Sequence, residues 1–202
     1  MSHQSKGSST TNNLPNVARS SQKRWLKRYY FIRTVFSAVW VAAALTVGQY
    51  SPTIAAILLV AYPAWDAAAN YLDASRSGGL VQNRTQTINV VVSVATTLAV
   101  IVALQIGMNW VLAVFGAWAI LSGLLQLSTA VRRWKSYGAQ WIMILSGAQS
   151  ALAGAFFILQ SRMPTMPSIA TVAGYAAFGA VYFAISAVWL SVSDLRRKPR
   201  AV

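Results

Sequence analysis

Six apolar runs follow one another along the chain, and short polar stretches separate them. The runs cover residues 33–49, 53–72, 86–105, 109–131, 139–160 and 169–191. Each is close to the roughly 20 residues that a helix needs to cross the hydrocarbon core of a bilayer. A lipid-exposed backbone must satisfy its own hydrogen bonds, and the runs lack the alternation of a membrane barrel. The pattern predicts an all-α, polytopic membrane protein with six transmembrane helices in a membrane domain at residues 33–195.

The segments that flank this domain differ from it in composition. Residues 1–22 are rich in serine, threonine and asparagine and have no apolar period, so we expect a disordered polar leader. Residues 23–32 mix basic and aromatic side chains, which is typical of a juxtamembrane segment anchored on an anionic inner leaflet. Residues 196–202 form a basic tail. The expected partners are therefore the lipid bilayer and anionic inner-leaflet lipids.

Positive charge is distributed unevenly between the two sides of the predicted domain. The chain has 17 lysine and arginine residues against 3 acidic ones, which gives a net charge of +14. Every lysine and arginine except Arg162 lies in the leader and its junction, in the second or fourth separator, or in the tail. If each of the six helices crosses the membrane once, all these segments lie on the same side of it. An excess of basic residues marks the cytoplasmic side. We expect a multi-pass inner-membrane protein with both termini in the cytoplasm and without a nucleic-acid partner.

The apolar runs lack the side chains that most catalysis and metal binding require. The chain has no cysteine, and its one histidine, His3, lies in the polar leader. The acids are Asp66, Asp73 and Asp194, and the first two share one face of one helix instead of facing each other across a cleft. A zinc or haem site, a nucleophilic triad and a catalytic carboxylate pair are therefore not expected. We expect a protein that is not an enzyme and has no cofactor or metal.

An internal repeat groups the six runs into three helical hairpins. The second, fourth and sixth runs each contain an aromatic residue, a small residue, alanine and another aromatic residue, beginning at Tyr62, Phe115 and Tyr175. Each hairpin also combines a short outer turn with a longer basic inner segment. Chance similarity among alanine-rich membrane helices is the alternative explanation of the repeat.

Two stretches of the sequence resemble a known family. Val114–Lys135, VFGAWAILSGLLQLSTAVRRWK, and Trp141–Gly154, WIMILSGAQSALAG, are similar to HdeD-like integral membrane proteins, and a weaker likeness extends over all six runs. The resemblance implies a six-helix membrane domain, and the link of that family to acid resistance implies a role under stress. The matching residues are of the kind that pack helices together, so they indicate fold more than activity. We can place neither the basic leader nor the region around Asp66 in a family motif.

Asp66 is the acid that lies well inside a predicted helix, and an intramembrane carboxylate by default indicates function. It shares a polar stripe with Tyr62, Asn70 and Asp73, and other polar residues lie at similar depth on other helices. The candidate polar membrane cluster consists of Arg33, Tyr62, Asp66, Asn70, Asn89 and Gln126. Two interpretations stay open: Asp66 is a titratable functional group, or it pairs with Arg33 or an amide and locks the helices together.

Small residues recur every three or four positions in the last two runs, and such a pattern allows helices to approach closely. They are Gly147, Ala151, Gly154 or Ala155 in the fifth run, and Ala173, Ala177, Ala180 and Ala184 in the sixth. Packing within one chain is the first interpretation, and a homo-oligomer formed through these helix faces is the second.

These observations lead to two expectations about function. The first is a non-enzymatic inner-membrane protein that supports resistance to acid or envelope stress. The alternative is a small channel or transporter with a cytoplasm-facing polar cluster around Asp66. A relay across the whole membrane is disfavoured, because tyrosine is the only ionisable side chain in the outer halves of the runs. An enzyme that acts on lipid would need a converging acid, base and nucleophile, and the sequence offers no such set.

Overall fold

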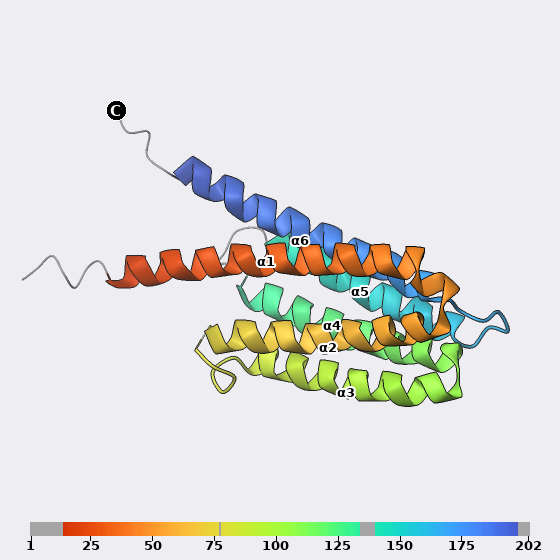
Figure 1. Cartoon of the computed structure of the whole chain (residues 1–202). Helices are drawn as coiled ribbons and strands as arrows, with labels where there is room; N and C mark the ends of the chain where they lie inside the picture. The colour runs from red at the N-terminus through yellow and green to blue at the C-terminus, as the bar shows by residue number, and fades with distance from the viewer. Residues whose placement is uncertain (1–13, 77, 134–139, 198–202) are drawn as a thin grey trace, which may run out of the picture.

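Six long helices form the bundle shown in Figure 1. The structure is a computed structural model that describes residues 14–76, 78–133 and 140–197. The helices are α1 (Leu14–Thr46), α2 (Pro52–Arg76), α3 (Arg84–Ile106), α4 (Met108–Arg133), α5 (Gln140–Gln160) and α6 (Ile169–Arg197), with a short 3-10 helix, η1, at Gly48–Tyr50. All six are long and apolar enough to cross a membrane. The predicted all-α, polytopic architecture with six membrane helices is confirmed.

The first helix begins earlier than the apolar pattern predicts. It begins at Leu14, so residues 14–22 of the expected disordered leader are helical. Pro15 stands in the first turn, where a missing N–H is tolerated, and a helix that is already nucleated gains a hydrogen bond with each added residue. At the other end of the chain, α6 continues to Arg197 and includes the start of the expected tail. The rest of the leader and tail, at 1–13 and 198–202, lies outside the described residues, as does 134–139 in the fourth separator.

The helices form a closed ring, because each contacts its neighbours in the chain and α1 also packs along α6. α1 begins and α6 ends at the same end of the bundle (Figure 1), which we call the terminal end. The chain connects the helices as the three predicted hairpins. η1 joins α1 to α2, Gly107 joins α3 to α4, and residues 161–168 join α5 to α6. The closest packing nevertheless joins α4 to α5, α1 to α6 and α2 to α3, so it runs between the hairpins more than within them.

Glycine explains why α4 and α5 approach each other so closely. A Cβ atom added to Gly123 would lie 2.5 Å from the carbonyl oxygen of Gly147, and one added to Gly154 would lie 2.4 Å from that of Gly116. No side chain fits at either crossing unless the helices move apart. The predicted small-residue face of α5 therefore packs inside the molecule, as the first interpretation proposed.

Large rings hold the first hairpin wider apart. Between α1 and α2, the rings of Phe36 and Trp65 stack with their centroids 4.4 Å apart, and those of Trp40 and Tyr62 lie 4.6 Å apart. Aromatic pairs at such distances contribute to packing in their own right. The size of the facing side chains thus accounts for the closer packing of α4 on α5 than of α1 on α2.

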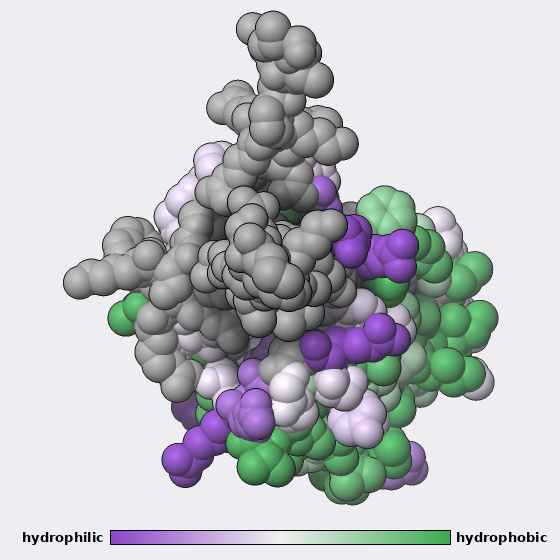
Figure 2. Space-filling model, turned by 90° about the vertical axis from the view of Figure 1, so that its left-hand side faces the viewer, coloured by the Kyte–Doolittle hydropathy of each residue, from purple (hydrophilic) through white to green (hydrophobic). Residues whose placement is uncertain are grey.

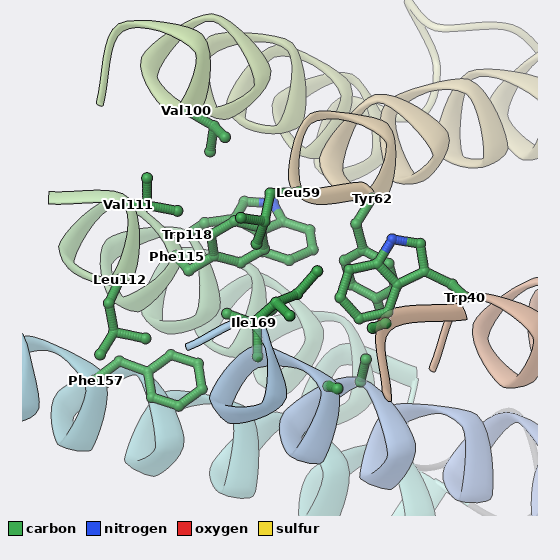
Figure 3. Packing of buried hydrophobic residues seen from close by; sticks show 14 of the residues in the cluster. Trp40, Leu59, Tyr62, Val100, Val111, Leu112, Phe115, Trp118, Phe157 and Ile169 are labelled. Carbon is green, nitrogen blue, oxygen red and sulfur yellow. The ribbon is translucent and has the colours of Figure 1, made fainter. Parts of the chain in front are cut away.

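The main apolar core lies in the half of the bundle away from the terminal end. Figure 3 shows rings and aliphatic groups from all six helices meeting there, including Trp40, Leu59, Phe115, Phe157 and Ile169. The first aromatic residue of each predicted repeat takes part, since Tyr62 and Phe115 belong to this cluster and Tyr175 packs against it. This half of the bundle is therefore filled by apolar side chains.

Candidate functional site

A buried ion pair between Arg33 and Asp66 joins α1 to α2. The pair lies between the apolar core and the terminal end, and the guanidinium Nη2 donates to the carboxylate Oδ1. The two side chains are only 13% and 11% exposed. Charges with so little contact with solvent are stable only when they are paired and hydrogen-bonded. Of the two interpretations of Asp66, this geometry corresponds to the pair with Arg33.

The second carboxylate oxygen of Asp66 extends the contact to two more helices. Its Oδ2 atom accepts hydrogen bonds from Nδ2 of Asn70 at 2.9 Å and from Oγ of Ser93 on α3 at 2.7 Å. Ser93 in turn accepts a hydrogen bond from Nε1 of Trp118 on α4, at 3.1 Å. Both oxygens of the carboxylate are thus occupied, and one chain of contacts connects α1, α2, α3 and α4.

Aromatic rings surround the guanidinium of Arg33 on its other sides. Nη1 donates to the hydroxyl of Tyr29, one turn earlier on α1, at 2.8 Å. The guanidinium carbon lies 4.4 Å from the ring centroid of Phe183 on α6, within the range of a cation–π interaction. We call Tyr29, Arg33, Asp66, Asn70, Ser93, Trp118 and Phe183 the Asp66 network. It links five of the six helices.

The side chains of the other predicted members of the cluster form no hydrogen bond with this network. Tyr62 lies one turn from Asp66 and belongs to the apolar core, where its ring meets Trp118 edge to face at 5.8 Å. Asn89 lies one turn from Ser93, and its buried Oδ1 atom has no hydrogen-bond partner in the described part of the chain. Gln126 is half-buried, and no hydrogen bond joins it to another described residue. The structure thus brings together Arg33, Asp66 and Asn70.

Four members of the network were not predicted from the sequence. A serine or an aromatic residue in an apolar run is common, so Ser93 and Phe183 carry no signal of their own. The sequence placed Trp118 in the predicted repeat and Tyr29 in the juxtamembrane segment, and it linked neither of them to Asp66. The spacing of Ser93, four residues after Asn89, places it on the same face of the helix and was the one available sign.

A second polar contact closes the terminal end between α1, α2 and α3. Asp73 accepts hydrogen bonds from Nε1 of Trp25 at 3.2 Å and from Nε2 of Gln86 at 2.6 Å. The guanidinium carbon of Arg76 lies 4.9 Å from the centroid of the Trp25 ring. Asp66 and Asp73 therefore each tie the first three helices together, at two different depths.

The chemistry that this arrangement allows is limited. The carboxylate of Asp66 is fully engaged by donors, and the residues that the structure describes include no cysteine or histidine that could act as a nucleophile or a second base. Within the described ranges, no group of three or more His, Cys, Asp or Glu residues is placed to hold a metal ion. The geometry is that of a cross-link between helices.

Comparison with known proteins identifies the class of the central helices. Residues 89–159, which run from α3 through α4 into α5, match the family described as a short repeat of unknown function (DUF308). The match confirms the resemblance found in the sequence, because HdeD-like membrane proteins typify this family. No curated protein and no solved structure gives a significant match. Ser93, Trp118 and the four glycines of the α4–α5 contact lie inside the matched segment, whereas Arg33 and Asp66 lie outside it.

Proposed function

We propose that this chain is a non-enzymatic, multi-pass protein of the inner membrane that supports resistance to acid or envelope stress. The observation that carries the proposal is the Asp66 network, in which every oxygen of the carboxylate is used to hold helices together. A group used in this way stabilises a scaffold, and it is poorly placed to bind a substrate or pass an ion. The role under stress is the expectation drawn from the resemblance to HdeD-like proteins, and the DUF308 match supports that resemblance.

The proposed orientation has both termini in the cytoplasm. α1 begins and α6 ends on the same side of the bundle, and every lysine and arginine among the described residues except Arg162 falls in a segment toward that side. In this orientation the apolar core fills the periplasmic half of the bundle, and the Asp66 network lies in the cytoplasmic half. The protein would act in the membrane through its packing or through contacts with partner proteins.

Survival of a strain without the gene tests this role. We expect the deletion strain to survive exposure to low pH or to agents that damage the envelope less well than its parent, and a plasmid copy of the gene should restore survival. Unchanged survival under every such condition would remove the basis for a stress function.

A small channel or transporter is the second candidate, and one observation favours it. Two buried oxygens, Oδ1 of Asn89 and Oγ of Ser122, have no hydrogen-bond partner in the described structure, and they lie on neighbouring helices α3 and α4. Unpaired acceptors of this kind could receive a passing solute. Flux of protons or small ions into vesicles containing the purified protein would support this candidate, provided that the variant Asn89→Leu abolishes the flux.

A further inference from the structure

Two buried oxygen atoms in the half of the bundle toward the terminal end have no hydrogen-bond partner among the described residues. They are Oδ1 of Asn89 on α3 and Oγ of Ser122 on α4. An asparagine oxygen accepts hydrogen bonds, and a serine hydroxyl both donates and accepts. Buried polar groups are in the great majority hydrogen-bonded, because an unpaired one costs free energy. The two atoms therefore point to a partner that is not a side chain of the described part of the chain.

The hydrogen bond between Trp118 and Ser93 fixes where the two oxygens lie relative to each other. Asn89 lies four residues before Ser93, and Ser122 lies four residues after Trp118. α3 runs away from the terminal end and α4 runs toward it (Figure 1), so both steps lead about 6 Å toward that end and stay on one face of each helix. Asn89 and Ser122 thus lie at one depth on the facing sides of α3 and α4.

Neighbouring side chains do not supply the partner. Asn70 lies at the same depth on α2, but its Nδ2 atom donates to the backbone oxygen and to Oδ2 of Asp66. The hydroxyl of Thr129, also on α4, donates to the backbone oxygen four residues earlier, whereas that of Ser122 does not. The hydroxyl hydrogen of Ser122 is therefore available to a group between the helices.

The chemistry of the two atoms selects the kind of molecule that joins them. It must donate to the amide oxygen of Asn89, and it must be able to accept from the hydroxyl of Ser122. An anion cannot donate to an amide oxygen, and a metal cation leaves the hydroxyl hydrogen without an acceptor. Water does both, and buried water molecules typically bond to polar groups of this kind. We propose that a water molecule binds between Asn89 and Ser122 and joins α3 to α4 one turn from the bond between Ser93 and Trp118.

The surroundings of this site indicate from which side the water enters. Gln126 lies one turn nearer the terminal end than Ser122 on the same face of α4, and its side chain is half-buried and not hydrogen-bonded to a described residue. In the other direction, the bond between Trp118 and Ser93 and the apolar core close the space between the helices. Solvent from the terminal end thus reaches to within one turn of Ser93 in the Asp66 network, and no farther. Figure 2 looks onto this end of the molecule.

The melting temperature of the purified protein tests the bridge by its sign. A bound water makes both oxygens stabilising, so Asn89→Leu and Ser122→Ala should each lower the melting temperature. The double variant should lose less than the two single losses together, because either change already releases the water. Without a bound molecule, each substitution removes an unpaired oxygen and should raise the melting temperature. A rise in either single variant, or strictly additive losses, would overturn the bridge.

Two controls make this result specific. The hydroxyl of Ser191 donates only to a backbone oxygen of its own helix, so Ser191→Ala should change the melting temperature little. The measurement is repeated with sodium, potassium or a large organic cation as the only cation in the buffer. Equal melting temperatures are expected with water. A rise with sodium or potassium that disappears in Asn89→Leu would assign the site to a metal ion and overturn the proposal.

Single cysteines test the entry of water, since the chain has no cysteine of its own. Silver ions are added to membrane fragments that are open on both sides, because a thiol ionises and reacts only where water reaches it. Ser122→Cys should react at least about tenfold faster than Leu124→Cys, which has nearly the same depth but lies on the outer face of α4, where Leu124 is 53% exposed. Gln126→Cys should react at least as fast as Ser122→Cys, and Thr96→Cys, beyond Ser93, should be slow. Equal rates at 122 and 124, or a fast reaction at 96, would overturn the entry from the terminal end. Neither stress survival nor ion flux enters these measurements, so the inference fails separately from both proposed functions.

Discussion

Replacement of Asp66 by asparagine removes one charge and almost no volume from the most connected point of the bundle. The new amide can still accept one hydrogen bond from Asn70 or Ser93. Arg33, however, would keep its charge in a site where its side chain is only 13% exposed. Its remaining neighbours are the hydroxyl of Tyr29 and the ring of Phe183, and neither carries a negative charge.

The size of the effect follows from which partner is left behind. Removing one member of a buried pair typically costs about 3–5 kcal/mol, because the other charge stays buried without compensation. Arg33→Met should cost less, about 2 kcal/mol, since the carboxylate of Asp66 keeps its two hydrogen-bond donors, Asn70 and Ser93. The double variant Arg33→Met/Asp66→Leu replaces the pair by apolar groups and should return to within about 1 kcal/mol of the wild type.

Thermal or denaturant unfolding of the purified protein, followed by the fluorescence of its 8 tryptophans, measures these differences. Asp73→Asn is the matched control, because this carboxylate accepts hydrogen bonds but forms no ion pair with a described residue. The order of stability should be wild type, double variant, Arg33→Met and then Asp66→Asn. If Asp66→Asn lost no more stability than Asp73→Asn, the ion pair would not be the cross-link that we infer.

Two further predictions concern packing and topology. Gly154→Ala should destabilise the protein by about 1–3 kcal/mol, because its methyl group would lie 2.4 Å from the carbonyl oxygen of Gly116. Gly174 has open space around it, so Gly174→Ala should be neutral or slightly stabilising in the same unfolding assay. Equal effects of the two variants would refute the close α4–α5 contact. Single cysteines at Ser51 or Thr165 should react with an impermeant reagent from the periplasm and one at Ser75 only after the cell is opened, and the reverse pattern would contradict the orientation. Gly107 is a poor labelling site because its φ of 149° strains any other residue.

The apolar runs were enough to predict the number of membrane helices and most of their bounds. Their length and the breaks at Gly107 and Pro52 carry that information directly. The start of α1 was missed because residues 14–22 lack an apolar period, and a helix that extends out of a membrane does not need one. The packing of α4 on α5 depends on Gly116 and Gly123 facing Gly147 and Gly154, and a single sequence does not show which small residues face each other.

The candidate site was predictable where charge was involved. Charged residues inside apolar runs are rare, so Asp66 and Arg33 stood out, and their similar depth made a pair a natural interpretation. Ser93 and Trp118 complete the site through hydrogen bonds that depend on the rotation of α3 and α4 about their axes. Asn89 and Gln126 lie on these two helices too, but about one turn and two turns nearer the terminal end than Ser93 and Trp118, so they lie outside the network.

The central claim is that Arg33 and Asp66 act by holding helices together and not by any chemistry of their charges. The direct test is to place the double variant Arg33→Met/Asp66→Leu in the deletion strain, confirm its abundance in the membrane, and measure survival under the stress to which that strain is sensitive. The account predicts that the uncharged pair restores survival to the wild-type level. A variant that is as abundant and stable as the wild type but fails to restore survival would contradict it, because the charges themselves would then be required.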